Sequence, residues 1–152
     1  MAIAVGQAAP DFKLKATGDQ EVSLSDFSGK PLVILFYPLD FSPVCSVQVP
    51  DFNNRLADIK AAGAEVIAIN RDSVYSHNAW CKELGGVDFP LLADMNLAVS
   101  KAYGVALDAG ITTRACVIVD KDGKVAFSHV EESPADNTLP VDKVIEVVKG
   151  LN

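Results

Sequence analysis

The feature that most constrains this chain is an unbroken apolar run from Leu32 to Tyr37. A strand that is apolar at every position has no face suited to water, so it belongs at the centre of a sheet that is covered on both sides. Pro38 follows directly, and proline cannot donate a hydrogen bond to a neighbouring strand. The run therefore predicts a central strand of a layered α/β domain that ends at Pro38.

Helical and strand patterns alternate along the rest of the chain. Residues 43–62 read as a helix, with Ser42 as the N-cap, Pro43 as the first helical residue, and a kink or break at Pro50. The other predicted elements are a hairpin over 13–24, strands over 65–70, 89–92 (a short edge strand), 114–119 and 125–130, and helices over 73–84, 96–103 and 141–151. This order predicts one domain over residues 1–152, with three α/β/α layers around a central mixed sheet.

Charge and composition limit the kinds of partner that we expect for this chain. The chain has 152 residues, 22% of them charged, and a formal net charge of -7. Such a surface repels phosphate backbones and anionic lipid, so neither nucleic acid nor a membrane is an expected partner. The N-terminus lacks the basic start and apolar core of a signal peptide, and no apolar run is long enough to cross a bilayer, so we expect a cytoplasmic location.

Cysteine is the residue type that suggests chemistry. Cys45, Cys81 and Cys116 are widely spaced and form no C-x-x-C or metal-ligand pattern. Cys45 falls in the first turn of the helix after the central strand, where free backbone N–H groups and positive potential favour a thiolate. The residues alone leave a second interpretation open, because a cysteine without a partner is often only a small core residue.

The segment around Cys45 resembles the active-site motif of the peroxiredoxins, in which proline, threonine or serine, and the peroxidatic cysteine are spaced as Pro38, Ser42 and Cys45 are here. It is most similar to the peroxiredoxin Q (bacterioferritin comigratory protein) branch. Motifs at 9–12, 71–77, 89–94, 102–105 and 114–123 follow in the family's order, so the resemblance covers nearly the whole chain. It implies a thioredoxin-like fold.

The resemblance also implies a role for each of four residues. Cys45 attacks a peroxide oxygen as a thiolate. The Ser42 hydroxyl hydrogen-bonds the thiolate and the peroxide, Arg114 favours the thiolate and holds the peroxide oxygens, and Pro38 shields the sulfur from water. Taken without the resemblance, Ser42 reads as a helix cap and Arg114 as a surface charge.

Two positions depart from the family pattern. Gln48 stands where many members have glutamate, which questions an ion-pair network around Arg114. Pro50 stands where many peroxiredoxin Q members have a second, resolving cysteine. Some members carry that cysteine on the following helix, so the resemblance points to Cys81 as the resolving residue.

The remaining candidates on these elements are interpreted as structural. Cys116 reads as a core residue of its strand. His77 and Trp80, on the same helix as Cys81, read as packing or capping residues.

The function implied is a thiol peroxidase that reduces hydrogen peroxide or organic hydroperoxides. Its reductant is expected to be thioredoxin or a similar dithiol protein, no metal, haem or flavin cofactor is implied, and either a monomer or a homodimer is compatible. Two alternatives stay open. Residues 40–45 also resemble the one-cysteine alkyl-hydroperoxide-reductase E type, in which an external thiol replaces Cys81, and a redox sensor or holdase could use Cys45 without turnover.

Overall fold

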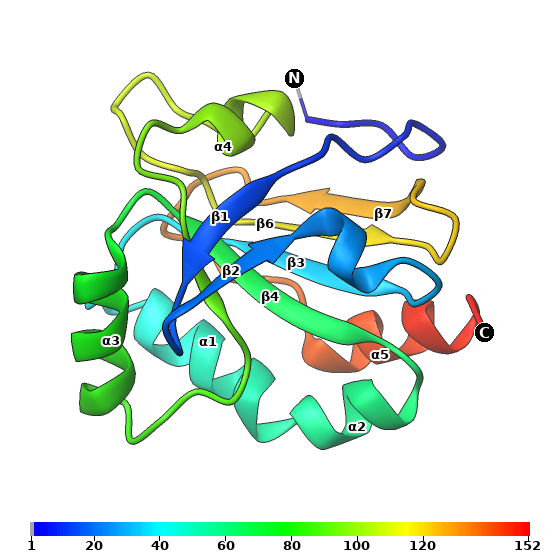
Figure 1. Ribbon diagram of the computed structural model, residues 1–152, viewed down its shortest axis with the longest axis horizontal. Coiled ribbons are helices and arrows are strands. Elements are labelled where there is room, and N and C mark those ends of the chain that lie inside the picture. The colour runs from blue at the N-terminus through cyan, green and yellow to red at the C-terminus, as the bar shows by residue number, and fades with distance from the viewer. Residues whose placement is uncertain (1) are drawn as a thin grey trace.

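A computed structural model describes residues 2–152 of the chain as a seven-stranded sheet covered by helices (Figure 1). The strands lie in the order β2-β1-β5-β4-β3-β6-β7. Their bounds are β1 Lys13–Ala16, β2 Gln20–Ser23, β3 Leu32–Phe36, β4 Glu65–Asn70, β5 Leu91–Ala93, β6 Ala115–Val119 and β7 Val125–Val130. The helices are α1 Cys45–Asn54, α2 Leu56–Ala61, α3 Val74–Glu83, α4 Ala98–Ala102 and α5 Val141–Lys149, with a short 3₁₀ helix at Leu24–Phe27.

Strand β3 is the centre of the sheet, as the apolar run predicts. It pairs in parallel with β4 and antiparallel with β6, and all five of its side chains are buried. Val33 and Leu35 face a core built with α1, α2, α3 and α5, whereas Ile34 and its alternate neighbours face a second core that includes residues of α4 and the N-terminal hairpin. Figure 1 shows α1, α2 and α5 on one side of the sheet and α4 on the other. The three-layer prediction is confirmed.

The prediction of an edge strand over residues 89–92 is wrong. Strand β5 lies inside the sheet, between β4 and β1. The N-terminal hairpin covers its outer edge through the Ala16–Leu92 pair and a hydrogen bond from Thr17 N to Leu91 O (3.1 Å). This pairing joins segments about 75 residues apart, so no local pattern could indicate it.

The helix predicted over 43–62 differs at its start and in its middle. It begins at Cys45, and the Ser42 side chain caps nothing; the carbonyl oxygen of Ser42 instead accepts a hydrogen bond from Ser46 N (2.9 Å). Pro50 stays inside α1, and the break falls at Arg55. Pro50 lies in the second turn, where it removes a single backbone donor, whereas Arg55 N turns back to Phe52 O (3.2 Å) and ends the helix.

The remaining predicted elements are present, with ends shifted by a few residues. Ser73 caps α3, because its hydroxyl oxygen accepts a hydrogen bond from Ser76 N (3.2 Å). Helix α5 buries Val144, Ile145 and Val148. The β6–β7 turn closes with Gly123 at φ 85°, a conformation that glycine adopts without strain.

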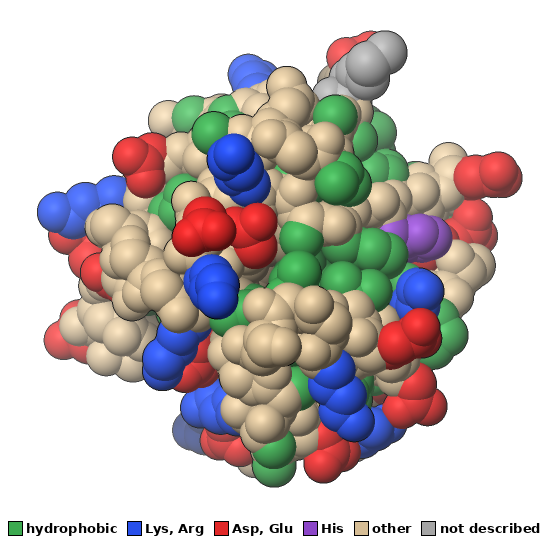
Figure 2. Space-filling view, turned by 90° about the vertical axis from the view of Figure 1, so that its right-hand side faces the viewer, with side chains coloured by type: hydrophobic (Ala, Val, Ile, Leu, Met, Phe, Trp, Pro, Cys, Tyr) green, Lys and Arg blue, Asp and Glu red, His purple; other side chains and the backbone are tan. Residues whose placement is uncertain are grey.

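The face shown in Figure 2 carries acidic and basic side chains interspersed around a strip of hydrophobic ones, so neither charge sign dominates this face. Within residues 2–152, no helix is both long and apolar enough to cross a bilayer.

Candidate active site

Cys45 is the first residue of α1, just beyond the carboxyl end of β3, and its side chain is completely buried. The connecting loop, residues 37–44, starts from a hydrogen bond between Tyr37 N and Ile69 O (3.3 Å) that extends the β3–β4 pairing. The sulfur therefore sits at the N-terminus of a ten-residue helix, at the edge of the sheet where parallel strands end and ligands commonly bind.

Arg114 brings a guanidinium group to this sulfur. It precedes β6, whose first residue pairs with the last residue of β3. Its Nη2 donates to Cys45 Sγ (3.1 Å), its Nη1 donates to Gln48 Oε1, and its Nε and Nη2 donate to Pro134 O (3.2 and 3.0 Å). Arg114 is only 2% exposed, and of these three partners only the sulfur can become an anion. The buried guanidinium therefore has two neutral oxygen acceptors and the Cys45 sulfur as its hydrogen-bond partners.

Ser42 places an unsatisfied hydroxyl three residues before Cys45. Its Oγ is buried and has no hydrogen-bond partner among the described residues. Such groups are rare in folded proteins and often mark a place where a ligand binds. The hydroxyl is available to a bound oxygen compound.

The loop before Ser42 contains a strained residue. Phe41 has a φ of 67°, which is an outlier for a bulky side chain and costs of order 1 kcal/mol or more. Asp40 holds this loop in place, because its backbone N donates to Asp72 Oδ2 (2.8 Å). Strain of this kind persists only where neighbouring contacts fix the backbone, and it is common next to active sites.

The side chain of Asp40 anchors a buried polar network. Its carboxylate is 2.7 Å from His77 Nδ1 and accepts hydrogen bonds from Tyr37 Oη (2.7 Å), Ser76 Oγ (2.8 Å) and Asn70 Nδ2 (3.2 Å). Burial alone would raise the pKa of Asp40, but the hydrogen bond and charge of His77, together with the hydroxyl donors, lower it. Burial, with Asp40 nearby, raises the pKa of Tyr37 well above its usual value, so the phenol stays neutral.

Comparison with known proteins agrees with this arrangement. The AhpC/TSA family model matches residues 5–128. A putative peroxiredoxin from the rubredoxin operon of Clostridium pasteurianum is 36% identical over 97% of this chain and 88% of that protein. The chloroplastic 2-Cys peroxiredoxin BAS1 of Spinacia oleracea is 41% identical over 97% of this chain, which spans 59% of its length. The reduced 2-Cys peroxiredoxin of Plasmodium vivax superposes with a TM-score of 0.88 at 34% identity, covering 95% of this chain and 79% of that one. The chain is a peroxiredoxin of the AhpC/TSA family.

In this peroxiredoxin, α3 lies directly against the start of α1. The ring of Trp80 stacks on Tyr37, with centroids 5.4 Å apart, and its Nε1 donates to Ser46 Oγ (3.3 Å). His77 is fully buried, with Nε2 3.0 Å from Leu92 O. Both residues pack and anchor α3, which agrees with their structural interpretation from the sequence.

The other two cysteines of the peroxiredoxin differ in environment. Cys81 is half-buried on α3, where burial, with a smaller effect of Asp40, raises its pKa to about 11. Cys116 is 2% exposed in β6, and burial raises its pKa to about 12, as expected of a core residue. None of the three cysteines forms a disulfide, and no group of three or more His, Cys, Asp or Glu side chains within residues 2–152 is arranged to hold a metal ion.

Two contacts of this site could not be read from the sequence. Gln48 was noted only as a departure from the family pattern, yet it accepts a hydrogen bond from Arg114. The carbonyl of Pro134 is a main-chain group in a polar loop, so no side-chain motif marks it. Asp40 lies within the quoted motif, but its role as a buried anchor depends on Asn70, Ser76 and His77, which are distant in sequence. Pro38 is buried where β3 ends.

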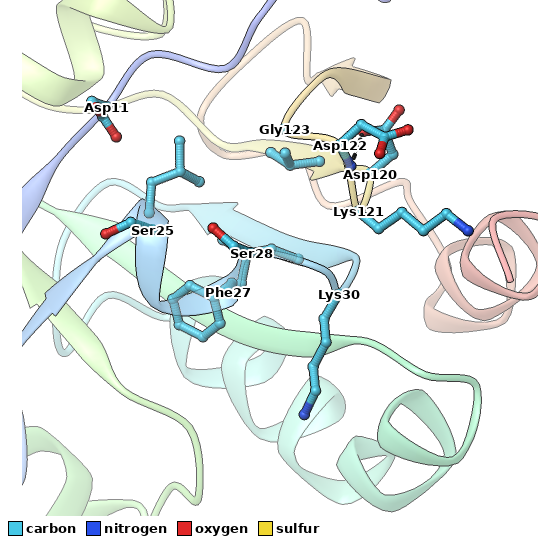
Figure 3. Close-up of a pocket in the computed structure, with 12 residues that line it drawn as sticks. Asp11, Ser25, Phe27, Ser28, Lys30, Asp120, Lys121, Asp122 and Gly123 are labelled. Atoms are coloured by element: carbon cyan, nitrogen blue, oxygen red, sulfur yellow. Dashed lines mark hydrogen bonds between the residues drawn. The ribbon is translucent and has the colours of Figure 1, made fainter.

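A cavity of about 220 Å³ opens at the opposite end of β3 and β6 from Cys45, lined by residues such as Leu32, Val119 and Gly123 (Figure 3). Figure 3 shows Lys30 and Lys121 pointing in different directions rather than converging on the cavity. A binding site normally has a few polar groups that converge on the ligand. The site at Cys45 is therefore the better candidate for chemistry.

Proposed function

We propose that this peroxiredoxin reduces hydrogen peroxide and organic hydroperoxides at Cys45. The observation that carries the proposal is the hydrogen bond from the buried Arg114 guanidinium to the Cys45 sulfur (3.1 Å). The Cys45 thiolate attacks one peroxide oxygen, a sulfur–oxygen bond forms and the O–O bond breaks. The departing oxygen takes a proton and leaves as water or an alcohol, and Cys45 becomes a sulfenic acid.

The neighbours of the sulfur suit this step. The Ser42 hydroxyl, buried and without a partner, is available to hydrogen-bond a peroxide oxygen. Arg114 supplies positive charge where negative charge builds up on the two oxygens, and fixed donors of this kind are among the largest contributions to catalysis. Pro38 and the burial of Cys45 keep bulk water away from the reacting atoms.

We propose Cys81 as the resolving residue. Its thiolate would attack the sulfur of the Cys45 sulfenic acid, form a disulfide and release water. The hydrogen bond from Trp80 Nε1 to Ser46 Oγ (3.3 Å) joins the two helices that carry these cysteines. Since the pKa of Cys81 is raised to about 11 in the folded protein, little thiolate exists at neutral pH, and we expect α3 to unwind locally before the disulfide forms.

An external thiol is the second candidate for resolution. Two features favour an external thiol. Cys81 is half-buried with a raised pKa, so it is not a ready thiolate, and position 50 holds a proline that has no thiol. Mass spectrometry after one equivalent of peroxide separates the two routes. A Cys45–Cys81 disulfide supports the first, and a lone sulfenic acid in a Cys81-containing protein supports the second.

We propose thioredoxin or a similar dithiol protein as the electron donor. We also propose a cytoplasmic location and a monomer or homodimer as the active form. The motif around Cys45, residues 36–48, favours the peroxiredoxin Q branch as the nearest subgroup. The test is peroxide consumption coupled to thioredoxin, its reductase and NADPH. Cys45→Ser should abolish turnover, because an alcohol is too weakly acidic to supply the nucleophile. Turnover retained in this variant would refute the assignment of Cys45, and oxidation without turnover in the wild type would favour a sensor.

A further inference from the structure

The loop that follows β7 is closed by a buried carboxylate. Glu131 is 7% exposed, and its two oxygens accept hydrogen bonds from Thr138 N (2.8 Å) and Thr138 Oγ1 (2.6 Å). His129 Nε2 lies 3.2 Å from the same carboxylate. Burial would raise the pKa of Glu131, but the bonds from Thr138 and the contact with His129 lower it, so the carboxylate is ionised at neutral pH.

This closed loop, residues 131–138, is attached to Arg114 at two places. Glu131 N donates to Arg114 O (3.0 Å), which fixes the start of the loop to β6. Further along, Pro134 O accepts from both Nε and Nη2 of the guanidinium. A turn in which Ser133 O accepts from Asp136 N (2.9 Å) holds this carbonyl in place.

Just beyond the loop, Leu139 and Val141 pack against the core that includes Phe52 of α1. A cavity of about 200 Å³ lies between Gln48, Asp51 and Phe52 of α1 and residues 137–141. The titratable side chain in contact with the Glu131 carboxylate is His129 of β7, and Asp51 lines the cavity beside Thr138. Within the loop itself, the two hydrogen bonds from Thr138 to Glu131 join its end to its start.

We propose that Glu131 is a positioning residue for the peroxidase reaction, which closes the 131–138 loop so that the Pro134 carbonyl aims the Arg114 guanidinium at the Cys45 sulfur. An arginine has five N–H donors in a rigid plane, so acceptors on two sides fix the direction of the rest. Pro134 and Gln48 are those acceptors, and the remaining Nη2 donor points at Cys45. Small errors in such an orientation reduce rates strongly.

This inference rests on the proposed function, and the test measures the rate at which peroxide oxidises Cys45. Stopped-flow fluorescence of Trp80, the single tryptophan of the chain, reports the reaction because its ring stacks beside the site. Glu131→Gln and Thr138→Val each remove part of the closure, and each should slow oxidation by roughly tenfold. Thr138→Ser keeps the hydroxyl and should restore the wild-type rate. Glu132→Gln, an exposed neighbour, is the matched charge control.

The decisive measurement repeats Glu131→Gln in an Arg114→Lys background. If Glu131 acts through the guanidinium, the same change should alter the remaining rate by less than about twofold there. A tenfold loss in both backgrounds, or wild-type oxidation in Glu131→Gln and Thr138→Val, would overturn the inference. Thermal unfolding identifies any variant that fails to fold. If Glu131→Gln does not fold, Thr138→Val is used for the test instead, because it changes the side-chain volume only slightly. A wild-type protein that does not react with peroxide would overturn the proposed function instead.

Discussion

Replacement of His77 by glutamine is predicted to destabilise the protein through Asp40. Glutamine can still reach the Leu92 carbonyl in place of Nε2, but it is not expected to replace the Nδ1 contact with Asp40, now 2.7 Å. The side chains of His77 and Asp40 are 0% and 1% exposed, so water cannot compensate. The carboxylate would then remain buried with only the neutral donors of Tyr37, Ser76 and Asn70.

The magnitude follows from the burial and from the donors that remain. Removing one partner of a buried ion pair typically costs about 3–5 kcal/mol. Three neutral hydrogen bonds still stabilise Asp40, which favours the lower end, about 3 kcal/mol. For a domain of this length, each kcal/mol lowers the melting temperature by about 2–4 °C, so we expect a decrease of roughly 6–12 °C.

The assay is thermal and urea unfolding followed by Trp80 fluorescence, with Asn78→Ala on the exposed side of the same helix as the control. The control should unfold within about 0.5 kcal/mol of the wild type. If His77→Gln is as stable as Asn78→Ala, Asp40 does not depend on His77 and the reasoning is refuted. If the reasoning holds, adding Asp40→Asn to His77→Gln should lower the stability little further, because it removes the buried charge that His77→Gln leaves without a partner.

Four further predictions follow from the site and its charges. Arg114→Ala should fold but oxidise about a hundredfold or more slowly, measured by stopped flow, and a near-wild-type rate would reduce Arg114 to a structural residue. Ser42→Ala should also slow oxidation while Ser42→Thr should not, and equal rates in the two variants would show that the hydroxyl has no part in the reaction. Cys81→Ser should complete one fast oxidation and then stall as a sulfenic acid that over-oxidises at lower peroxide, whereas wild-type turnover would establish external resolution. The pKa of Asp40 is lowered on folding, so Asp40 stabilises the folded protein above its unfolded pKa of about 3.9, and this stabilisation is lost as the pH falls through the folded value. Asp40→Asn should therefore flatten the acid side of the curve of unfolding free energy against pH. An unchanged curve would contradict this reasoning.

Local patterns in the sequence were sufficient for most of the element order. The run 32–37 has no polar face, so it could only be a strand covered on both sides. One error arose where distant segments meet. The hairpin pairing that places β5 inside the sheet depends on loop closure and register, which leave no trace in the short segment 89–92.

The candidate site divides in the same way. Cys45 at a helix N-terminus after a buried strand is determined by the sequence, because both features are encoded within fifteen residues. The contact of Arg114 with the sulfur joins residues 69 positions apart. The Glu131–Thr138 hydrogen bonds close a loop that presents a main-chain carbonyl, and the buried carboxylate of Asp40, in the loop before α1, is contacted by His77 of α3. Such contacts form only when the chain is folded, because the energy of a buried charge depends on all the groups that surround it in space and not on its neighbours in sequence.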